Sequence, residues 1–207
     1  MGLSADQLRT SLDALADIEP AFAAAIARSG YPEPRISQPG YATLLRTIVG
    51  QQISVAAAAS VWAKLEAALG DLTDPAVVAA ASDETLRTAG FSRQKAGYAR
   101  SLADEVTSGR LDLAHLPADD EAAIAQLVRV KGIGRWSAEI YLLFAEGRAD
   151  VWPAGDLAVQ IEVGRILGHD ARPSEKATRA LAEAWRPHRG AAAIMAWHHY
   201  KTDMAVI

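Results

Sequence analysis

The sequence predicts an all-α protein. Apolar residues repeat at the three- and four-residue spacing of one helix face, as in Tyr41, Leu44, Leu45, Ile48 and Val49. No segment keeps the two-residue alternation of a half-buried strand. With 207 residues, of which 50% are hydrophobic, the chain can bury a substantial core, either as one domain or as two small ones.

Cap residues and turn formers divide the chain into short helices. Residues 4–29 are alanine-rich and helical in pattern, and Pro20 can open a second helix within them. Residues 29–40 are dense in glycine and proline and form a connector. The bounds of the other predicted helices follow from serines and aspartates that can cap a helix start and from glycines that can end a helix. These helices run over residues 41–50, 54–70, 74–90 (as short pieces), 92–106, 156–167, 174–185 and 190–201.

Residues 116–148 predict a hairpin of two helices. The first begins near Leu116, where acidic residues favour a helix N-terminus. Gly132 and Gly134 supply the positions without a Cβ that so tight a turn needs. The first N–H groups of the second helix then form an anion site, best suited to a phosphate. One-face apolar patterns flank the turn: Ile124, Leu127 and Val128 before it, and Trp136, Ile140, Leu143 and Phe144 after it.

Charge and composition narrow the class of protein. The formal net charge is −4 and the pI is about 5.7, so the chain lacks the overall basic excess of many DNA binders. Arg129, Lys131 and Arg135 nevertheless cluster around the hairpin and predict a small positive footprint. The absence of cysteine excludes disulfides, thiolate zinc sites and cysteine-held iron–sulfur clusters.

Neither a membrane segment nor a metal site is evident in the sequence. No apolar run approaches the roughly 20 residues that a membrane span requires, and the N-terminus shows no secretory signal. We therefore expect a cytoplasmic protein. Adjacent residues on a helix point about 100° apart, so His198 and His199 are poor joint metal ligands, and no other set of histidines and carboxylates has metal-binding spacing.

Two motifs resemble those of a known family. The runs Lys-Gly-Ile-Gly-Arg-Trp-Ser-Ala (131–138) and Trp-Pro-Ala-Gly-Asp-Leu-Ala (152–158) are similar to the signature of the helix-hairpin-helix (HhH-GPD) base-excision DNA glycosylases. Within that superfamily, these runs and the Gly-Gln-Gln block at 50–52 most resemble the 3-methyladenine DNA glycosylase II branch. The resemblance extends from about Tyr41 to Trp197.

The resemblance implies a fold of two helical subdomains with an active-site cleft between them. The middle bundle would comprise residues 40–148, with the helix-hairpin-helix motif at about 120–147. The second bundle would be formed by both chain ends, residues 1–39 plus 149–207.

Asp156 is the candidate catalytic residue. Cleavage of an N-glycosidic bond leaves the sugar oxocarbenium-like, and a carboxylate beside the anomeric carbon stabilises that charge and can activate water. Aspartate is also a good helix cap, so Asp156 could simply cap the helix that starts at Leu157. Both roles can hold together, because a cap would fix the carboxylate and keep it ionised.

Aromatic residues are the candidate walls of a base pocket. Trp136 occupies the position where bifunctional relatives carry a lysine nucleophile; tryptophan cannot form a Schiff base, so the resemblance implies a glycosylase without lyase activity. Trp136 and Trp197 match aromatic pocket positions, where indoles would attract a cationic alkylated purine. Ile140 stands where this branch can carry a tyrosine, which leaves the substrate range open. Trp62 is assigned to the core, and Trp152 could belong to either.

The resemblance also assigns DNA-contacting residues. Gln52 matches the wedge that fills the gap left by an extruded base, although it could be an ordinary polar loop residue, and Gln51 is expected to bridge loop backbone groups. The hairpin would hold DNA phosphates through the backbone amides of Gly132, Gly134 and Ser137 and through the basic side chains of Lys131 and Arg135. The turn carbonyls that match a structural Na⁺ or K⁺ site belong to Val128, Val130 and Ile133.

The sequence is therefore interpreted as a monomeric, monofunctional DNA glycosylase that acts on duplex DNA containing damaged bases. It would flip alkylated purines of the 3-methyladenine type out of the duplex, hydrolyse the N-glycosidic bond and leave an abasic site, with no required cofactor. Two alternatives remain: a glycosylase for deaminated or oxidised bases, and a helix-hairpin-helix module that binds DNA without chemistry.

Overall fold

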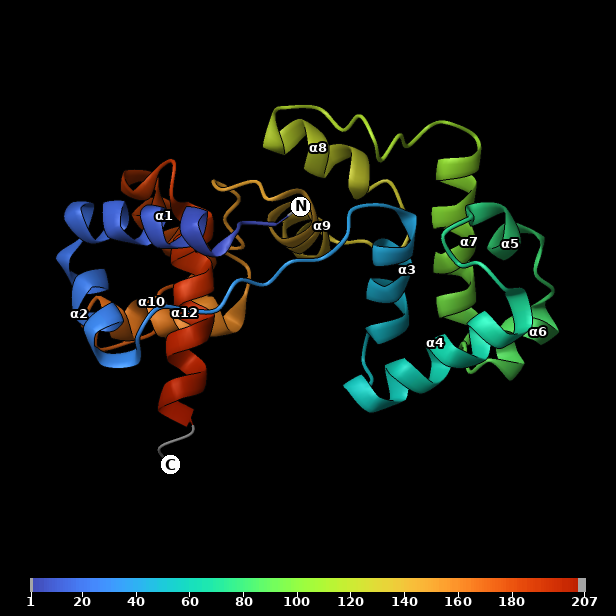
Figure 1. Ribbon diagram of the computed structural model, residues 1–207, viewed down its shortest axis with the longest axis horizontal. Coiled ribbons are helices and arrows are strands. Elements are labelled where there is room, and N and C mark those ends of the chain that lie inside the picture. Colours follow the sequence, from blue (N-terminus) through green and yellow to red (C-terminus); the bar gives the residue numbers. More distant parts are fainter. Residues whose placement is uncertain (1, 205–207) are drawn as a thin grey trace. The chain divides into compact units, whose positions relative to one another are not determined.

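A computed structural model describes residues 2–204, and within them the chain is helical and contains no strand, which confirms the predicted class (Figure 1). A π-helical turn, η1, follows α9, and a 3-10 turn, η2, follows α11. None of the helices in the described residues is both long and apolar enough to span a membrane. The elements in chain order are α1 (Ala5–Ile18), α2 (Pro20–Ser29), α3 (Tyr41–Gly50), α4 (Val55–Leu69), α5 (Pro75–Ala80), α6 (Asp83–Thr88), α7 (Arg93–Thr107), α8 (Asp120–Leu127), α9 (Arg135–Tyr141), η1 (Leu142–Glu146), α10 (Leu157–Ile166), α11 (Glu175–Leu181), η2 (Ala182–Trp185) and α12 (Arg189–Met204).

The chain divides into two compact units. The terminal unit comprises Met1–Ser37 and Leu142–Ile207, and the middle unit comprises Gln38–Tyr141. The second boundary falls between α9 and η1, earlier than the predicted residue 148.

The middle unit is built around α3 and α7. Helix α3 packs against α4 and α7, and α5 packs against α7. Local cap signals set the helix starts: Ser54, Asp74, Ser82, Ser92 and Asp119 each accept a hydrogen bond from a first-turn N–H group. The largest side chains that are fully buried here are Leu44, Leu45, Ile48, Leu65, Leu86, Leu102 and Leu127.

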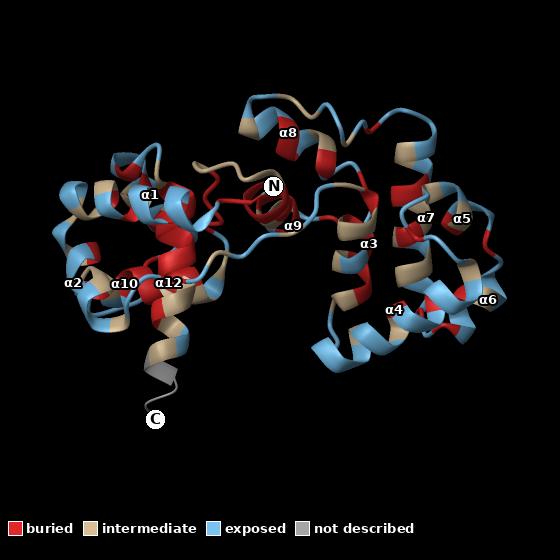
Figure 2. Ribbon diagram, in the orientation of Figure 1, coloured by how far each residue is buried: buried red, intermediate tan, exposed pale blue. Residues whose placement is uncertain are grey.

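The terminal unit is built around α12, which packs against α1, α2 and α10. Figure 2 shows the first half of α12 buried, and this half is formed mainly by small residues at 191–193 and 196. Three aromatic rings lie next to this packing: Phe22 meets Trp185 edge-on at 5.1 Å between ring centroids, and Trp185 meets Trp152 edge-on at 5.6 Å. Trp152 is therefore a core residue, which resolves the alternative left open by the sequence.

The hairpin helices differ from the prediction in two respects. The first, α8, begins at Asp120 rather than near Leu116, because Asp119 caps it. In the second, α9 buries Ser137, Ala138 and Tyr141, whereas Trp136, predicted on the apolar stripe, is 47% exposed. The π-helical turn after α9 was not predicted, since one extra residue per turn leaves no periodic signal in so short a segment.

Candidate active-site loop and DNA-binding hairpin

Asp156 caps α10, which is one of the two roles that the sequence left open for it. Its backbone is extended (φ −72°, ψ 123°), and a side-chain oxygen accepts a hydrogen bond of 2.9 Å from the Val159 N–H. The side chain is only partly buried, so the carboxylate is oriented by the helix start and still reaches the surface of its unit.

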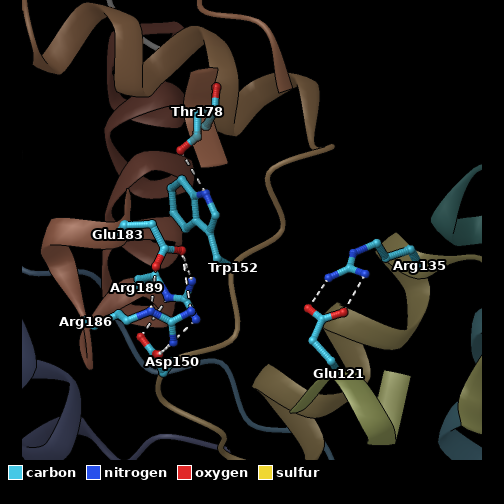
Figure 3. A network of polar contacts seen from close by, with 8 residues as sticks. All are labelled: Glu121, Arg135, Asp150, Trp152, Thr178, Glu183, Arg186 and Arg189. Carbon is cyan, nitrogen blue, oxygen red and sulfur yellow. Dashed lines mark hydrogen bonds and ion pairs between the residues drawn. The ribbon is translucent and has the colours of Figure 1, made fainter. Parts of the chain in front are cut away.

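The loop before Asp156 is held by a network of ion pairs (Figure 3). Nε and Nη2 of Arg189 each lie 2.9 Å from a different oxygen of Asp150. Arg186 donates a third bond to Asp150, of 2.7 Å. Both arginines also bind Glu183 on η2. Two parallel bonds between an arginine and a carboxylate stabilise the fold and also hold both groups in one geometry.

Further contacts hold the same loop on both sides of this network. The Gly190 N–H donates to the Ala149 carbonyl at 2.8 Å, and the Trp152 indole N–H donates to the Thr178 carbonyl at 3.2 Å. The buried amide of Gln160 donates to the Ala154 carbonyl at 2.8 Å. Asp156 thus follows a segment that is bonded to α10 and α12 through its backbone carbonyls and to α11 through the Trp152 side chain. Sequence patterns gave no sign of Arg189 or Gln160, because their partners are set only by the fold.

Gly132 is required by the hairpin turn for two reasons. Its φ is +88°, in the left-handed region that favours glycine. A Cβ at this position would lie 2.3 Å from Cδ2 of Tyr98 on α7. Gly134 has neither constraint, because its φ is not in that region and a Cβ would meet nothing within 4 Å. The prediction that the turn itself needs Gly134 was therefore wrong.

The predicted positive footprint is partly neutralised within the protein. Arg135 donates two parallel hydrogen bonds to Glu121 on α8 (Figure 3) and a third to Glu139 at 2.9 Å. The hydrogen bonds that Arg135 donates to Glu121, followed by the charge of Glu139, raise the pKa of the Arg135 guanidinium above its already high ordinary value. Arg129 lies 3.5 Å from Glu105. Lys131 is exposed and makes no ion pair in the part of the chain that the structure describes.

The loop between α3 and α4 touches the hairpin. The side-chain amide of Gln51 donates to the Gly132 carbonyl at 2.8 Å, which confirms that Gln51 bridges loop backbone groups. Gln52 is exposed and has a φ of +58°. No other non-glycine residue in the described chain has a positive φ. A non-glycine residue held in this region costs free energy and often marks a functional loop.

The predicted pocket residues are surface-accessible to different degrees. Trp136 is 47% exposed, and Ile140 and Trp197 are partly buried. Trp197 is tilted by 38° against Phe144, with ring centroids 5.6 Å apart. Trp62, assigned to the core, is 6% exposed, with the Arg46 guanidinium 3.7 Å from its ring centroid.

Among the candidate cation ligands, the Val130 carbonyl already accepts a hydrogen bond of 3.0 Å from the Ile133 N–H. A carbonyl has a second lone pair, so this bond leaves one lone pair on the Val130 oxygen; the carbonyls of Val128 and Ile133 are the other two predicted ligands. No group of three or more His, Cys, Asp or Glu residues that could hold a metal is found among the described residues.

This hairpin, with its glycine turn and the helix-capping aspartate that follows it in the chain, defines a helix-hairpin-helix protein. The family model described as HhH-GPD superfamily base excision DNA repair protein matches residues 45–187, and the chain belongs to that superfamily.

Named relatives share most of this chain's length. The chain is 29% identical over 188 residues to DNA-3-methyladenine glycosylase 2 of Escherichia coli, covering 84% of this chain and 64% of that protein. It is 27% identical over 165 residues to the Bacillus subtilis protein YfjP, provisionally named a DNA-3-methyladenine glycosylase, covering 76% of this chain. The matching region spans 58% of YfjP, so both relatives extend well beyond the part they share with this chain.

Solved structures have the same fold. A DNA-3-methyladenine glycosidase from Bacillus halodurans matches with a TM-score of 0.87 and 29% identity, covering 94% of this chain and 91% of that one. The Schizosaccharomyces pombe 3-methyladenine DNA glycosylase Mag1, in complex with abasic DNA, matches with a TM-score of 0.75 and 26% identity, covering 94% of this chain and 97% of that one.

Proposed function

We propose that the protein is a monofunctional DNA glycosylase that removes alkylated purines of the 3-methyladenine type from duplex DNA. The observation that carries the proposal is Asp156, a carboxylate fixed by the start of α10 and preceded by a multiply bonded loop. The names of the relatives support the alkylated-base class of substrate. The protein would act as a monomer in the cytoplasm, on DNA in the nucleoid.

The proposed reaction needs one carboxylate and one water molecule. As the bond between the base nitrogen and the anomeric carbon breaks, the base leaves with the bonding electrons and the sugar becomes positively charged. The Asp156 carboxylate stabilises that charge and takes a proton from the attacking water, whose oxygen bonds to the anomeric carbon. An alkylated purine is already cationic and leaves as a neutral base, so no strong acid is required. The product is an abasic site.

Base recognition is proposed for Trp136, Trp197 and Ile140. The indole of Trp136 is among the large apolar side chains most exposed in the described residues, and it can offer its face to a flat cationic base. By the resemblance of its motif, Trp136 stands where a lyase of this superfamily would carry its amine, and an indole cannot form a Schiff base. Hydrolysis without strand cleavage is therefore proposed.

DNA contacts are proposed for the hairpin and the α3–α4 loop. The backbone amides of Gly132, Gly134 and Ser137 would hold a phosphate, with the Lys131 ammonium nearby in sequence and a monovalent cation on the turn carbonyls. The open space around Gly134 supports this role, because a group from outside the protein could approach its backbone. Gln52 would enter the duplex where the base has left.

A comparison of the wild type with Asp156→Asn tests the proposal. Asparagine caps helices as well as aspartate does, so the variant should unfold at the wild-type denaturant concentration while losing the charge. Each protein would be incubated with duplexes that carry one lesion each: 3-methyladenine or a stable analogue, 1,N6-ethenoadenine, and hypoxanthine. Abasic sites would be revealed by alkali, with an untreated control.

Base release from the alkylated duplex by the wild type alone, with strand breaks only after alkali, is the expected result. Strand breaks without alkali would contradict the monofunctional assignment. Release of hypoxanthine in preference to the alkylated base would transfer the proposal to deaminated bases. Duplex binding with no release of any base would make the protein a non-catalytic DNA-binding module.

A further inference from the structure

Helix α7 contacts the hairpin turn and the end of α3, which leads into the α3–α4 loop. Lys95, Tyr98 and Ser101 follow one another at three-residue intervals along α7, so they lie on one side of the helix. The Lys95 ammonium donates a hydrogen bond of 2.7 Å to the Val49 carbonyl, in the last turn of α3. Val49 lies three positions before Gln52, the proposed wedge.

The next two residues of this row contact the hairpin turn. The ring of Tyr98 lies so close to Gly132 that a Cβ there would be 2.3 Å from it. The hydroxyl of this tyrosine accepts a hydrogen bond of 2.5 Å from the Gln94 side chain, one turn earlier. The Ser101 hydroxyl accepts a hydrogen bond of 3.0 Å from the Lys131 N–H. The same side of α7 thus holds the end of α3 and the hairpin turn.

A direct bond closes the arrangement. The Gln51 side chain donates to the Gly132 carbonyl at 2.8 Å, so the α3–α4 loop touches the hairpin turn directly, while α7 contacts the hairpin turn and the end of α3. Lys95 also supplies what α3 lacks, because α3 has no basic residue in its own last turn and a cation near the final carbonyls stabilises a helix end. Partial burial lowers the pKa of the Lys95 ammonium, consistent with an amine that lies against the protein rather than in open solvent.

We propose that Lys95, Tyr98 and Ser101, here termed the α7 brace, are positioning residues that fix the wedge Gln52 in register with the hairpin turn. This inference rests on the proposed function. The physical reason is the left-handed backbone of Gln52: a strained conformation persists only when neighbouring contacts hold it. With Lys95 removed, the end of α3 loses its anchor and Gln52 can relax to a negative φ, while the hairpin still binds phosphate.

The test compares Lys95→Met with Lys64→Met. Methionine keeps most of the apolar stem and removes the donor and the charge; Lys64, exposed on α4, is a matched loss of one charge. Lys95→Arg is the rescue variant, since its guanidinium can still donate to the Val49 carbonyl.

Four quantities would be measured for each variant. They are the amide hydrogen exchange of residues 50–54 in the free protein, the affinity for undamaged duplex as a function of salt concentration, the fluorescence of 2-aminopurine beside the lesion, and single-turnover base release.

Lys95→Met is expected to speed exchange of residues 50–54 about 10-fold or more and to slow base flipping and base release by about 10-fold to 100-fold. Its affinity for undamaged duplex and its dependence on salt should match those of Lys64→Met. The arginine variant should restore most of the base release.

Three results would overturn the proposal. Unchanged exchange of residues 50–54 would show that Lys95 does not hold the loop. Faster exchange with unchanged base release would show that the wedge needs no such anchor. A loss of duplex affinity with a shallower salt dependence, beyond that of Lys64→Met, would make Lys95 a phosphate contact.

If the wild type itself releases no base, the proposed function fails. The α7 brace is then judged by the hydrogen exchange of residues 50–54 and by binding to duplexes that contain an abasic-site analogue. Lys95→Met should bind these duplexes more weakly than Lys64→Met.

Discussion

Arg189 and Asp150 form a two-pronged ion pair in which both nitrogen–oxygen distances are 2.9 Å. Asp150 lies six positions before Asp156 (156 − 150), and Arg189 lies eight positions before Trp197 on α12 (197 − 189). The pair therefore joins the loop that carries the proposed catalytic carboxylate to the helix that carries a proposed pocket residue, within one compact unit. Support of this kind behind a site limits how far its reactive groups can drift.

Replacing Arg189 by methionine should destabilise the protein and reduce base release. Arg189 is 8% exposed, so the change leaves Asp150 short of a partner in a partly buried place, at an expected cost of about 1–3 kcal/mol. Arg186 remains bound to Asp150 and limits the loss. Urea unfolding would measure the change.

Arg179→Met is the matched control for this prediction. It removes a surface pair with Glu175 one turn away on α11, and such pairs contribute little. Equal urea midpoints for Arg189→Met and Arg179→Met would contradict a stabilising role for the Arg189–Asp150 pair.

Gly132→Ala and Gly134→Ala should behave differently although only one residue lies between the two positions. At Gly132 the new methyl group would meet the Tyr98 ring and force an alanine into a φ of +88°; strain and displacement together should cost roughly 2–4 kcal/mol. At Gly134 the methyl group meets nothing within 4 Å, so the urea midpoint should stay near that of the wild type. Only duplex affinity should fall in Gly134→Ala, because the methyl group would lie where a phosphate approaches.

The sequence predicted what depends on local signals. The helix starts at Ser54, Ser92 and Asp156 follow from side chains that bond to an N–H group three residues ahead. The bridging role of Gln51 was also predicted, and its partner is the Gly132 carbonyl. The residue roles proposed for DNA contact and catalysis stay predictions until they are measured.

What the sequence did not reveal depends on contacts between distant residues. Tyr98 lies 34 positions before Gly132 (132 − 98), and Glu121 lies 14 positions before Arg135 (135 − 121). Neither pair leaves a periodic pattern, so the positive footprint predicted from Arg135 did not include its neutralising carboxylates. The tightness of the turn predicted a need for glycine at both Gly132 and Gly134, whereas only the backbone of Gly132 has a positive φ.

Glu121→Gln should strengthen binding to undamaged duplex. The Arg135 guanidinium donates two hydrogen bonds to Glu121. A neutral amide at position 121 would hold the guanidinium less firmly and would remove one negative charge that repels DNA phosphates. If Arg135 then reaches a phosphate, the slope of log affinity against log salt should steepen by about 1. A fluorescence-anisotropy titration over a range of salt concentrations would measure both quantities. Glu33→Gln, which removes an exposed carboxylate from the connector, is the control, and an identical slope in the two variants would contradict the prediction.

Two substitutions of Gln52 should separate backbone strain from wedge function. Gln52→Gly and Gln52→Ala both remove the side chain proposed to enter the duplex, but only glycine adopts a φ of +58° without strain. Gln52→Gly should therefore be more stable than Gln52→Ala by about 1 kcal/mol in urea unfolding. Both variants should release the alkylated base more slowly than the wild type, by about 10-fold or more, because neither can fill the gap left by the flipped base.

The two variants are expected to differ in stability but to share the same loss of activity. A merely structural role for Gln52 would make the glycine variant both stable and fully active. Single-turnover base release with 2-aminopurine beside the lesion would show whether the slow step is flipping. Wild-type flipping by both variants would remove Gln52 from the proposed DNA-contacting residues and leave its left-handed backbone without a functional explanation.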